Sequence, residues 1–350
     1  MDVLQAVVEV KTPNVTYILP TQQINIDNVL ESYGSNVKLK DIKLSIEITK
    51  ASEQDTQFMK DIANKGNFTI IVQPYSFSVK ATYREDTVDI SRFNSYVERT
   101  IALPEDVNPS KITTGIVIEP DGTFRHMPTR ITVIGGKYYA KINSLTNSNY
   151  TAIWNPKKFK DIENHWAKKT INDMGSRMII SGVGDDMFEP KREITRAEFA
   201  AILVRALGLK PGIGNNSFSD VAGTDWYCDY VKTATKYNLI TGYGNGKFGP
   251  MDNITREQAI VMITRAMSMT GLKVEFTDGE KENILKAFKD ANESADYAKE
   301  SLAVCIKSGV VCSRDGELVA PKDNISRAEV ATIVQRLLQK SNLIHWCSIK

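Results

Sequence analysis

The chain has 350 residues, enough for two domains of ordinary size, and its 42% hydrophobic and 25% charged residues are typical of a globular protein. The formal net charge is only +2, so bulk electrostatics predicts neither nucleic acid nor a membrane surface as a partner. Apolar runs are short and interrupted, and none approaches the roughly 20 residues that a membrane-spanning helix needs. We therefore expect a two-domain globular chain without a membrane span.

The first five residues, Met-Asp-Val-Leu-Gln, lack the basic segment, apolar core and small-residue cleavage site of a secretion signal. Two interpretations fit this start. Either the protein is cytosolic, or the sequence is an excised or mature fragment.

The cysteines and histidines are too scattered to predict a metal site. No Cys-x-x-Cys pair occurs among Cys228, Cys305, Cys312 and Cys347, and the three histidines lie far apart in the sequence. We expect neither a metal nor a cofactor. Cys305 and Cys312 are close enough in sequence for a disulfide. The alternative is a buried thiol on a helix and a separate loop thiol, and the sequence does not decide between them.

Residues 1–153 show the alternation of apolar and polar residues that half-buried strands have. The segment 120–123, Pro-Asp-Gly-Thr, and the pair Gly135-Gly136 predict turns between strands. One amphipathic stretch, residues 53–64, predicts a short helix. These features favour an all-β domain, an antiparallel sandwich, as the fold of this half. The predicted strands are residues 6–11, 42–49, 68–74, 76–83, 114–119, 129–135 and 138–143.

From residue 154 to the end at residue 350 the periodicity becomes helical, and one pattern occurs three times, at about residues 159–209, 218–270 and 288–340. Each copy opens with Phe-x-Asp and continues with an aromatic residue, a proline and a Ser/Thr-Arg pair. The aromatic residue precedes the arginine by 30 residues in every copy, and the proline precedes it by 6. Chance does not produce that register. The three arginines are Arg196, Arg256 and Arg327.

Each copy is predicted to fold as helix, loop and helix. In the second helix apolar residues recur at i, i+3, i+4, i+7 and i+8, as in residues 199–207 and 330–338. A unit of two helices is too small to bury its own apolar face, so the three units should pack on one another. We expect Phe188, Phe248 and Val319 to be core residues. The spacing of a capping box occurs in Thr195 with Glu198, Thr255 with Gln258, and Ser326 with Glu329.

The arginine of each copy occupies the first position of the second helix, where the helix dipole disfavours a cation. This placement, repeated three times, predicts an anion that the arginine and the free backbone N–H groups hold together. The fork of donors on arginine suits a planar carboxylate. Replacing the arginine by alanine should then weaken binding and leave the fold unharmed. The alternative is an internal salt bridge to the aspartate of Phe-x-Asp, at Asp161, Asp220 or Asp290.

These residues resemble the S-layer homology repeats of bacterial surface proteins. That signature has Phe-x-Asp, His-Trp-Ala, a Gly-x-Gly-Asp-Gly loop and Ile-Thr-Arg-Ala-Glu-Phe, and the first copy matches it closely at residues 159–161, 165–167, 182–185 and 194–199. The resemblance covers about half of the chain. It implies a three-pronged helical spindle whose inter-repeat grooves bind a secondary cell-wall polysaccharide, commonly through a sugar that carries a pyruvate ketal. The ketal supplies a carboxylate.

Carried over position by position, the resemblance implies the arginines as carboxylate clamps and the aromatic residue of each copy as an apolar surface for the sugar. Core packing is the rival role of each aromatic residue. The aspartates are implied as groove-wall partners, and the loop glycines fit either a close approach of the sugar or turn geometry alone. The implied ligand-binding residues are Arg196, Arg256, Arg327, Trp166, Trp226, Tyr297, Asp161, Asp220, Asp290, Gly182, Gly184, Gly242 and Gly244.

The third copy departs most from the pattern. Tyr297 stands where the first two copies have tryptophan, and Ser313 stands where they have Gly182 and Gly242. We therefore expect the groove of the third repeat to be the weakest, while its apolar helix keeps a packing role.

Two other functions compete with anchoring. Residues 1–153 contain no nucleophile elbow, phosphate loop or metal-ligand cluster, so we expect a spacer or adhesive module and no enzyme. The alternative is a wall-tethered enzyme or adhesin whose N-terminal β domain carries the activity. A calcium-binding array at residues 185–186 and 245 lacks the ligand pattern of an EF-hand. The resemblance further implies an extracellular protein on the cell wall, part of a longer exported chain, and allows self-association in a surface layer.

Overall fold

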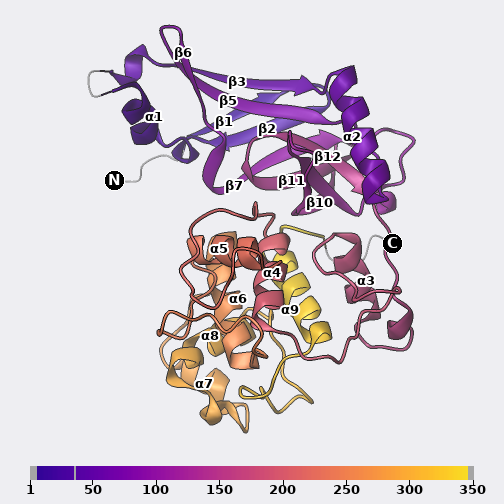
Figure 1. Cartoon of the computed structure of the whole chain (residues 1–350), viewed down its shortest axis with the longest axis vertical. Helices are drawn as coiled ribbons and strands as arrows, with labels where there is room; N and C mark the ends of the chain where they lie inside the picture. The colour runs from indigo at the N-terminus through magenta and orange to yellow at the C-terminus, as the bar shows by residue number, and fades with distance from the viewer. Residues whose placement is uncertain (1–5, 35–36, 346–350) are drawn as a thin grey trace. The chain divides into compact units, whose positions relative to one another are not determined.

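The computed structural model describes residues 6–34 and 37–345. The chain divides into two compact units, and the boundary falls between Asn155 and Pro156. The part before this boundary, the β domain, consists mainly of strands, and the part after it, the repeat unit, consists of helices and loops (Figure 1). An all-β part followed by a helical part is therefore confirmed.

The described residues of the β domain form two antiparallel sheets. The five-stranded sheet has the order β1 (Val7–Lys11), β2 (Val15–Pro20), β7 (Arg92–Ala102), β11 (Lys137–Thr146) and β10 (Thr129–Ile134). The other sheet has the order β3 (Lys43–Lys50), β5 (Tyr75–Tyr83), β12 (Asn149–Trp154), β8 (Thr114–Ile118) and β9 (Phe124–Met127). It is completed by β4 (Thr69–Ile70), which pairs with β12, and β6 (Asp86–Asp89), which pairs with β5.

Side chains from both sheets meet in one hydrophobic core. Along β2, the buried residues Val15, Tyr17 and Leu19 alternate with partly exposed ones, because successive side chains of a strand point to opposite faces. The ring centre of Tyr17 lies 5.4 Å from that of Phe77 on β5, and Phe77 lies 5.9 Å from Tyr150 on β12. Two sheets that share a core form a sandwich, as predicted.

Arg99 of β7 is fully buried inside this core. Its guanidinium carbon lies 4.5–5.4 Å from the centres of three aromatic rings, and its Nη1 and Nη2 atoms donate hydrogen bonds to three oxygens. The rings belong to Tyr17, Phe77 and Tyr150, and the oxygens to Val97, Thr146 and Asn147. No carboxylate of the described residues pairs with this cation.

Among the described residues of the β domain, two α-helices accompany the sheets. The first turn of α2 (Glu53–Gly66) is capped by Ser52, whose hydroxyl accepts a hydrogen bond from the N–H of Asp55. This confirms the helix predicted at residues 53–64. The helix α1 (Ile26–Tyr33) was not predicted, because two turns are too short for a helical period to stand out.

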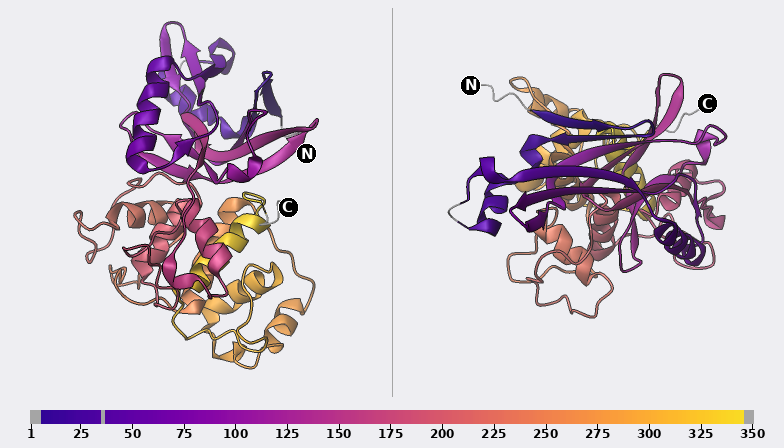
Figure 2. Two further views of the ribbon diagram at one scale, coloured as in Figure 1. Left: turned by 90° about the vertical axis from the view of Figure 1, so that its right-hand side faces the viewer. Right: turned by 90° about the horizontal axis from the view of Figure 1, so that it is seen from above.

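In the repeat unit, each repeat contributes a pair of helices, as predicted, and Figure 2 shows the pairs from two further directions. An additional helix, α7 (Glu280–Lys286), precedes the third pair. The pairs are α3 (Lys168–Ser176) with α4 (Arg196–Ala206), α5 (Cys228–Lys236) with α6 (Arg256–Thr270), and α8 (Asp296–Lys307) with α9 (Arg327–Lys340).

Each second helix begins with the predicted capping box. In α4 the N–H of Glu198 donates to the hydroxyl of Thr195, and the N–H of Thr195 donates to the carboxylate of Glu198. Gln258 and Glu329 take the place of Glu198 in α6 and α9. The predicted core residues Phe188, Phe248 and Val319 are buried.

A ring of three backbone hydrogen bonds joins the repeats. The N–H of Ile194 donates to the carbonyl of Ile325, that of Ile325 to Ile254, and that of Ile254 to Ile194, each at 3.1 Å. All three side chains are fully buried. Each repeat therefore contacts both others at the point where its second helix begins.

Candidate functional site

The three repeated arginines are almost fully buried, with only 5%, 3% and 7% of Arg196, Arg256 and Arg327 exposed. Each guanidinium reaches into the loop of another repeat. There Nε donates to the carbonyl of a buried residue, and Nη2 donates to a second carbonyl. The acceptors are Phe248 (2.8 Å) and Thr241 (3.0 Å) for Arg196, Val319 (2.9 Å) and Cys312 (3.2 Å) for Arg256, and Phe188 (2.8 Å) and Ser181 (2.6 Å) for Arg327.

This geometry corrects the expectation that the fold would not need the arginine. A helix dipole disfavours a cation that lies at the surface, whereas this side chain is buried and bonded to two backbone carbonyls of another repeat. Without the guanidinium, the carbonyl of the buried residue, Phe248, Val319 or Phe188, would lose its donor, which costs free energy of folding. The arginines therefore help to hold the repeats together.

The alternative of a salt bridge between arginine and the aspartate of Phe-x-Asp is also wrong for the described residues. The carboxylate of Asp220 instead accepts the N–H groups of Phe248 and Gly249, both at 2.8 Å. Asp161 and Asp290 bind residues 188–189 and 319–320 in the same way. Burial acts to raise the pKa of Asp220, but the two N–H donors hold it below its ordinary value. The aspartates brace the loops of their own repeats, and their contact with a sugar stays a prediction.

The remaining guanidinium nitrogen, Nη1, distinguishes the three arginines. Nη1 of Arg256 lies 3.0 Å from Oε1 of Glu329, and Nη1 of Arg327 lies 3.3 Å from Oε1 of Glu198. Both glutamates are capping-box residues, so they stabilise a helix start and neutralise an arginine of another repeat. The sequence analysis missed this second role, because the capping box already accounted for both residues.

Burial and pairing have opposite effects on these groups. Burial lowers the pKa of all three arginines. Burial also acts to raise the pKa of Glu198 and Glu329, but hydrogen bonds and nearby cations hold both below the ordinary value. The partners responsible are Arg192, Thr195 and Arg327 for Glu198, and Arg314, Ser326 and Arg256 for Glu329.

The aromatic residue of each repeat is exposed. Trp166, Trp226 and Tyr297 have 67%, 57% and 60% of their surface in solvent. Core packing as their role is therefore wrong. A large ring left in water beside a buried cation is more typical of a binding surface.

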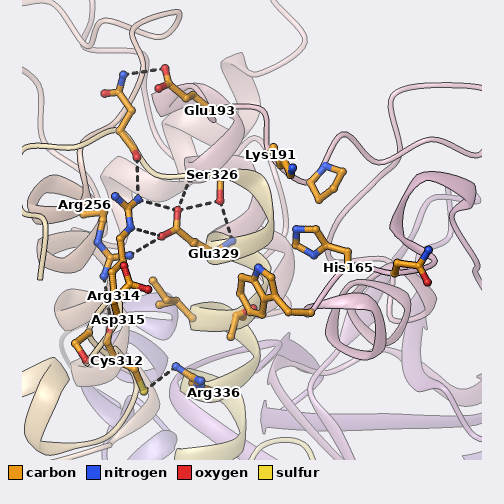
Figure 3. Close-up of a pocket in the computed structure, with 17 residues that line it drawn as sticks. His165, Lys191, Glu193, Arg256, Cys312, Arg314, Asp315, Ser326, Glu329 and Arg336 are labelled. Carbon is orange, nitrogen blue, oxygen red and sulfur yellow. Dashed lines mark hydrogen bonds and ion pairs between the residues drawn. The ribbon is translucent and has the colours of Figure 1, made fainter. Parts of the chain in front are cut away.

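A pocket of about 840 Å³, the Arg256 pocket, is lined by all three repeats. Trp166 comes from the first repeat, Arg256 from the second and Arg314 from the third. Figure 3 shows His165 and Lys191 on the opposite side of the pocket from Arg256 and Arg314. The guanidinium of Arg314 bonds Glu329 at 2.8 and 3.1 Å, so two arginines share this carboxylate.

A smaller pocket of about 180 Å³, the Arg327 pocket, has the same composite construction. Arg327 comes from the third repeat, Trp226 from the second, and Ser181 and Gly182 from the first. The pocket also contains Glu198, which pairs with Arg327.

The third combination, the Arg196 site, joins Arg196 of the first repeat to the loop of the second and to Tyr297 of the third. The guanidinium carbon lies 4.6 Å from the ring centre of Tyr243 and 4.8 Å from that of Phe248. Burial lowers the pKa of Arg196. Charges on Tyr243, Asp252 and Tyr297 act against that effect, so Tyr297 is one of the groups that interact electrostatically with the guanidinium.

No arginine therefore shares a site with the aromatic residue of its own repeat. The residues from which a weak groove of the third repeat was expected, Tyr297, Ser313 and Arg327, belong to three different sites. Tyr297 lies with Arg196, and Ser313 lines the Arg256 pocket. Arg327, by contrast, lies with Trp226 and the glycine loop of the first repeat. Sequence spacing within one repeat gave no signal for this exchange.

The loop glycines have structural reasons of their own. A Cβ on Gly182 would lie 2.7 Å from the carbonyl of Met187, and one on Gly242 would lie 2.4 Å from that of Lys247. Gly184 and Gly244 have positive φ angles of 121° and 86°. Packing and turn geometry account for these four glycines, and their contact with a sugar stays a prediction.

Three further residues of these sites were not predicted from the sequence: Tyr243, Arg314 and Arg336. Tyr243 and Arg314 occupy the same loop position, where the first repeat has Val183. A search for repeated residue types passes over such a position. The variation at this position could have indicated a functional residue. A different residue type in each repeat, in the loop that binds an arginine, can make the three sites differ from one another.

The described cysteines are free, so the disulfide between Cys305 and Cys312 does not form. Burial raises the pKa of Cys305 to about 12, and Cys312 lies 3.0 Å from Nη1 of Arg336. Cys347 lies outside the described residues. In residues 6–34 and 37–345, no group of three or more His, Cys, Asp or Glu residues could hold a metal ion. No helix in these ranges has the length and apolar character needed to cross a membrane.

A sequence model of the S-layer homology domain matches residues 158–200, 217–260 and 287–331. An amylopullulanase of Thermoanaerobacterium thermosulfurigenes is 32% identical over 321 residues, which are 89% of this chain and 16% of that protein. The exoglucanase XynX of Acetivibrio thermocellus is 37% identical over 185 residues, 53% of this chain and 16% of that protein. A surface layer protein of Brevibacillus choshinensis is 31% identical over 135 residues, 36% of this chain and 12% of that protein.

The chain thus matches only 16%, 16% and 12% of the lengths of these three relatives. The similarity to the amylopullulanase covers 89% of the chain, so it extends from the repeats into the β domain.

Proposed function

We propose that the repeat unit binds a wall polysaccharide through a sugar carboxylate. The repeat unit contains three S-layer homology domains, at residues 158–200, 217–260 and 287–331. Such domains indicate a surface protein that is anchored at the cell wall. The pyruvate ketal of a pyruvylated sugar is the group that we assign as the source of this carboxylate. The three repeats form one non-covalent anchor with the arrangement of a three-pronged spindle. The hydrogen-bonded ring of Ile194, Ile254 and Ile325 supports this arrangement.

One arrangement carries the proposal: a buried arginine beside an exposed aromatic ring, with the two residues always from different repeats. Trp226 beside Arg327 is an example, with 57% of the tryptophan in solvent. The face of an exposed ring suits the apolar face of a sugar. The guanidinium provides donors for a carboxylate on the same sugar.

The test is sedimentation of the full chain with purified sacculi, before and after chemical removal of the wall polysaccharide. We expect binding to intact sacculi only. Mild acid hydrolysis of the ketal, with the sugar chain left intact, then tests the carboxylate. Equal sedimentation with stripped sacculi would show that the polysaccharide is not the ligand.

A matched pair of variants tests the aromatic surface. Trp226→Ala should reduce sedimentation with intact sacculi, because it removes the ring beside Arg327. Tyr138→Ala removes an exposed ring of the β domain and should leave sedimentation unchanged. Equal losses in both variants would point to a general effect of exposed aromatic residues.

For the β domain we propose a spacer or adhesive role without catalysis. A second candidate is that this chain is the anchor of a longer, wall-tethered enzyme, and the names of the amylopullulanase and exoglucanase relatives favour it. Incubation of the full chain with starch and with xylan tests the proposal that the β domain is not catalytic. We expect no release of reducing sugar, and release abolished by a change in the β domain would assign catalysis to it.

We also propose an extracellular location on the wall and self-association into a surface layer. The strands β1 and β10 are the edges of the five-stranded sheet, and an open edge can pair with another chain. Val133 and Ile134 on β10 are exposed. Sedimentation velocity should show concentration-dependent association that Val133→Lys reduces.

A further inference from the structure

The third position of the second helix differs among the repeats. Glu198 and Glu329 occupy it in the first and third repeats, and Gln258 occupies it in the second. All three side chains close a capping box, so the fold accepts either residue type. Since each glutamate also neutralises an arginine of another repeat, Gln258 leaves one arginine without that partner.

That arginine is Arg196. Its Nε and Nη2 atoms donate to the carbonyls of Phe248 and Thr241, and its Nη1 has no hydrogen-bond or ion-pair partner among the described residues. This unpartnered Nη1 is not fully buried, so part of it is exposed to solvent. The equivalent atoms of Arg256 and Arg327 are bonded to glutamates.

The acids around Arg196 are engaged elsewhere. Asp252 accepts a hydrogen bond from the hydroxyl of Tyr243 at 2.9 Å. Glu257 is buried, and it binds Nζ of Lys322 at 2.6 Å and the hydroxyl of Tyr297 at 3.3 Å. Neither acid forms an ion pair with Arg196 among the described contacts. The guanidinium is therefore a nearly buried cation with one accessible donor and no protein carboxylate.

The loop of the second repeat is shaped to keep Asp252 in this state. A Cβ on Gly249 would lie 2.5 Å from the ring of Tyr243 and 2.4 Å from Oδ2 of Asp252. The first and third repeats have Glu189 and Ala320 at the equivalent position. Gly249 thus leaves room for the contact between Tyr243 and Asp252, which occurs beside the arginine that lacks a glutamate.

We propose that the Arg196 site is the principal carboxylate-binding site of this chain, and that Gln258 is the residue that makes it so. This inference rests on the proposed function. A ligand carboxylate that binds Nη1 of Arg196 gains a charge-assisted hydrogen bond without displacing a protein carboxylate. At Arg256 or Arg327, the ligand has to displace Glu329 or Glu198, or share the cation with a like charge.

The experiment is calorimetric titration of the full chain with a methyl hexoside that carries one pyruvate ketal. The methyl ester of the same compound is the uncharged control. Gln258→Glu should weaken the tightest binding about tenfold or more, because the new carboxylate competes with the ligand for Nη1. Glu198→Gln should leave the tightest site unchanged and strengthen a weaker one, because it frees Arg327.

Two measurements check the variants. Gln258→Glu should raise Tm, because its carboxylate pairs with Arg196 as Glu329 pairs with Arg256. Asn283→Asp adds the same charge at an exposed position of α7 and should change affinity by less than about twofold.

The outcomes separate the inference from the function on which it rests. If the unsubstituted chain binds the ketal but not the ester, and Gln258→Glu raises Tm without weakening binding, the inference is overturned and the proposed function stands. If the unsubstituted chain fails to bind the ketal, or binds the ester equally well, both are overturned. Weaker ketal binding in Gln258→Glu, without weaker binding in Asn283→Asp, supports the inference.

Discussion

Both parts of the chain bury an arginine without a carboxylate partner among the described residues, but the free donors differ. In the β domain, the unpartnered Nε of Arg99 is itself fully buried. In the repeat unit, the unpartnered Nη1 of Arg196 is not fully buried. The exposed Tyr297 is one of the groups that interact electrostatically with this guanidinium. A buried cation by itself therefore does not mark a binding site. A donor that a ligand can reach, next to an exposed ring, is the feature that does.

The two arginines also differ in what they hold together. Arg99 connects strands of one sandwich, where long ladders of backbone hydrogen bonds already join neighbours. Arg196, Arg256 and Arg327 connect different repeats, which also meet at the ring of isoleucines and where α4 packs on α5, α6 on α8 and α9 on α3. Changes in the repeat unit should therefore be transmitted between repeats, while changes at Arg99 should stay within the β domain.

The largest expected effect is on deletion of residues 288–350. The deletion removes Ile325, which takes part in two of the three hydrogen bonds of the ring. It also removes α9, whose Val330, Val334 and Leu337 are fully buried. Circular dichroism should show loss of the cooperative melting of the first two repeats, with the transition of the β domain retained. A cooperative helical transition in the truncated chain would mean that two repeats are self-sufficient.

The next effect in size is expected for Arg99→Ala. The change leaves a cavity between three aromatic rings and removes the donor for three oxygens, so the β domain should lose about 3–5 kcal/mol of unfolding free energy. Urea denaturation, monitored by the unfolding transition of the β domain, measures this loss of free energy. Binding to sacculi at low temperature should not change. A parallel fall in wall binding would show that the two parts of the chain are coupled.

Arg327→Ala should lower the unfolding free energy of the repeat unit by about 2–4 kcal/mol. It leaves the carbonyls of Phe188 and Ser181 without this donor, and it removes one of the two arginines that pair with Glu198. Arg196→Ala should cost less stability, since Arg196 has no carboxylate to leave behind. Its cost in ketal affinity should be the greater of the two. Thermal melting measures the loss of stability in both variants, and calorimetry measures the loss of ketal affinity. If one variant lost more of both, the prediction would be wrong.

Acid should remove part of the stability of the repeat unit. Glu198 and Glu329 have pKa values held below the ordinary 4.5 in the folded state. Their contribution is therefore complete above the unfolded pKa and is lost as pH falls through the folded pKa. The double variant Glu198→Gln, Glu329→Gln should melt below the unsubstituted chain at neutral pH, and the gap in Tm should close as pH falls below 4.5. A constant gap would exclude these two carboxylates as its cause.

The smallest effect is expected for Asp220→Asn. The amide oxygen can accept only part of what two carboxylate oxygens accept from Phe248 and Gly249, so we expect a loss of about 1 kcal/mol. Ketal affinity should change little, because the aspartate braces the loop. A fall in affinity at unchanged Tm would support the groove-wall role that the family resemblance implies.

The sequence by itself determined the elements whose causes are local. The three capping boxes, the arginine at the first position of each second helix and the buried stripe of α9 follow from residues within one helical turn or a few turns. Five strands of the β domain, by contrast, escaped prediction. One of them is the central β7, where charged residues interrupt the alternation and where Arg99 is buried. Only contact with strands far along the chain makes such a segment a strand.

The composition of the sites was decided by tertiary structure alone. Each arginine meets the loop of a second repeat and the aromatic residue of a third, and sequence spacing holds no information about which copies face one another. The same closure pairs Arg256 with Glu329 and Arg327 with Glu198 but leaves Arg196 opposite Gln258. In the sequence, Gln258 in place of glutamate makes no difference to the capping box, because either residue type closes it. In the folded chain it removes the counter-charge of a buried arginine in another repeat, because electrostatic partners are set by distance in space.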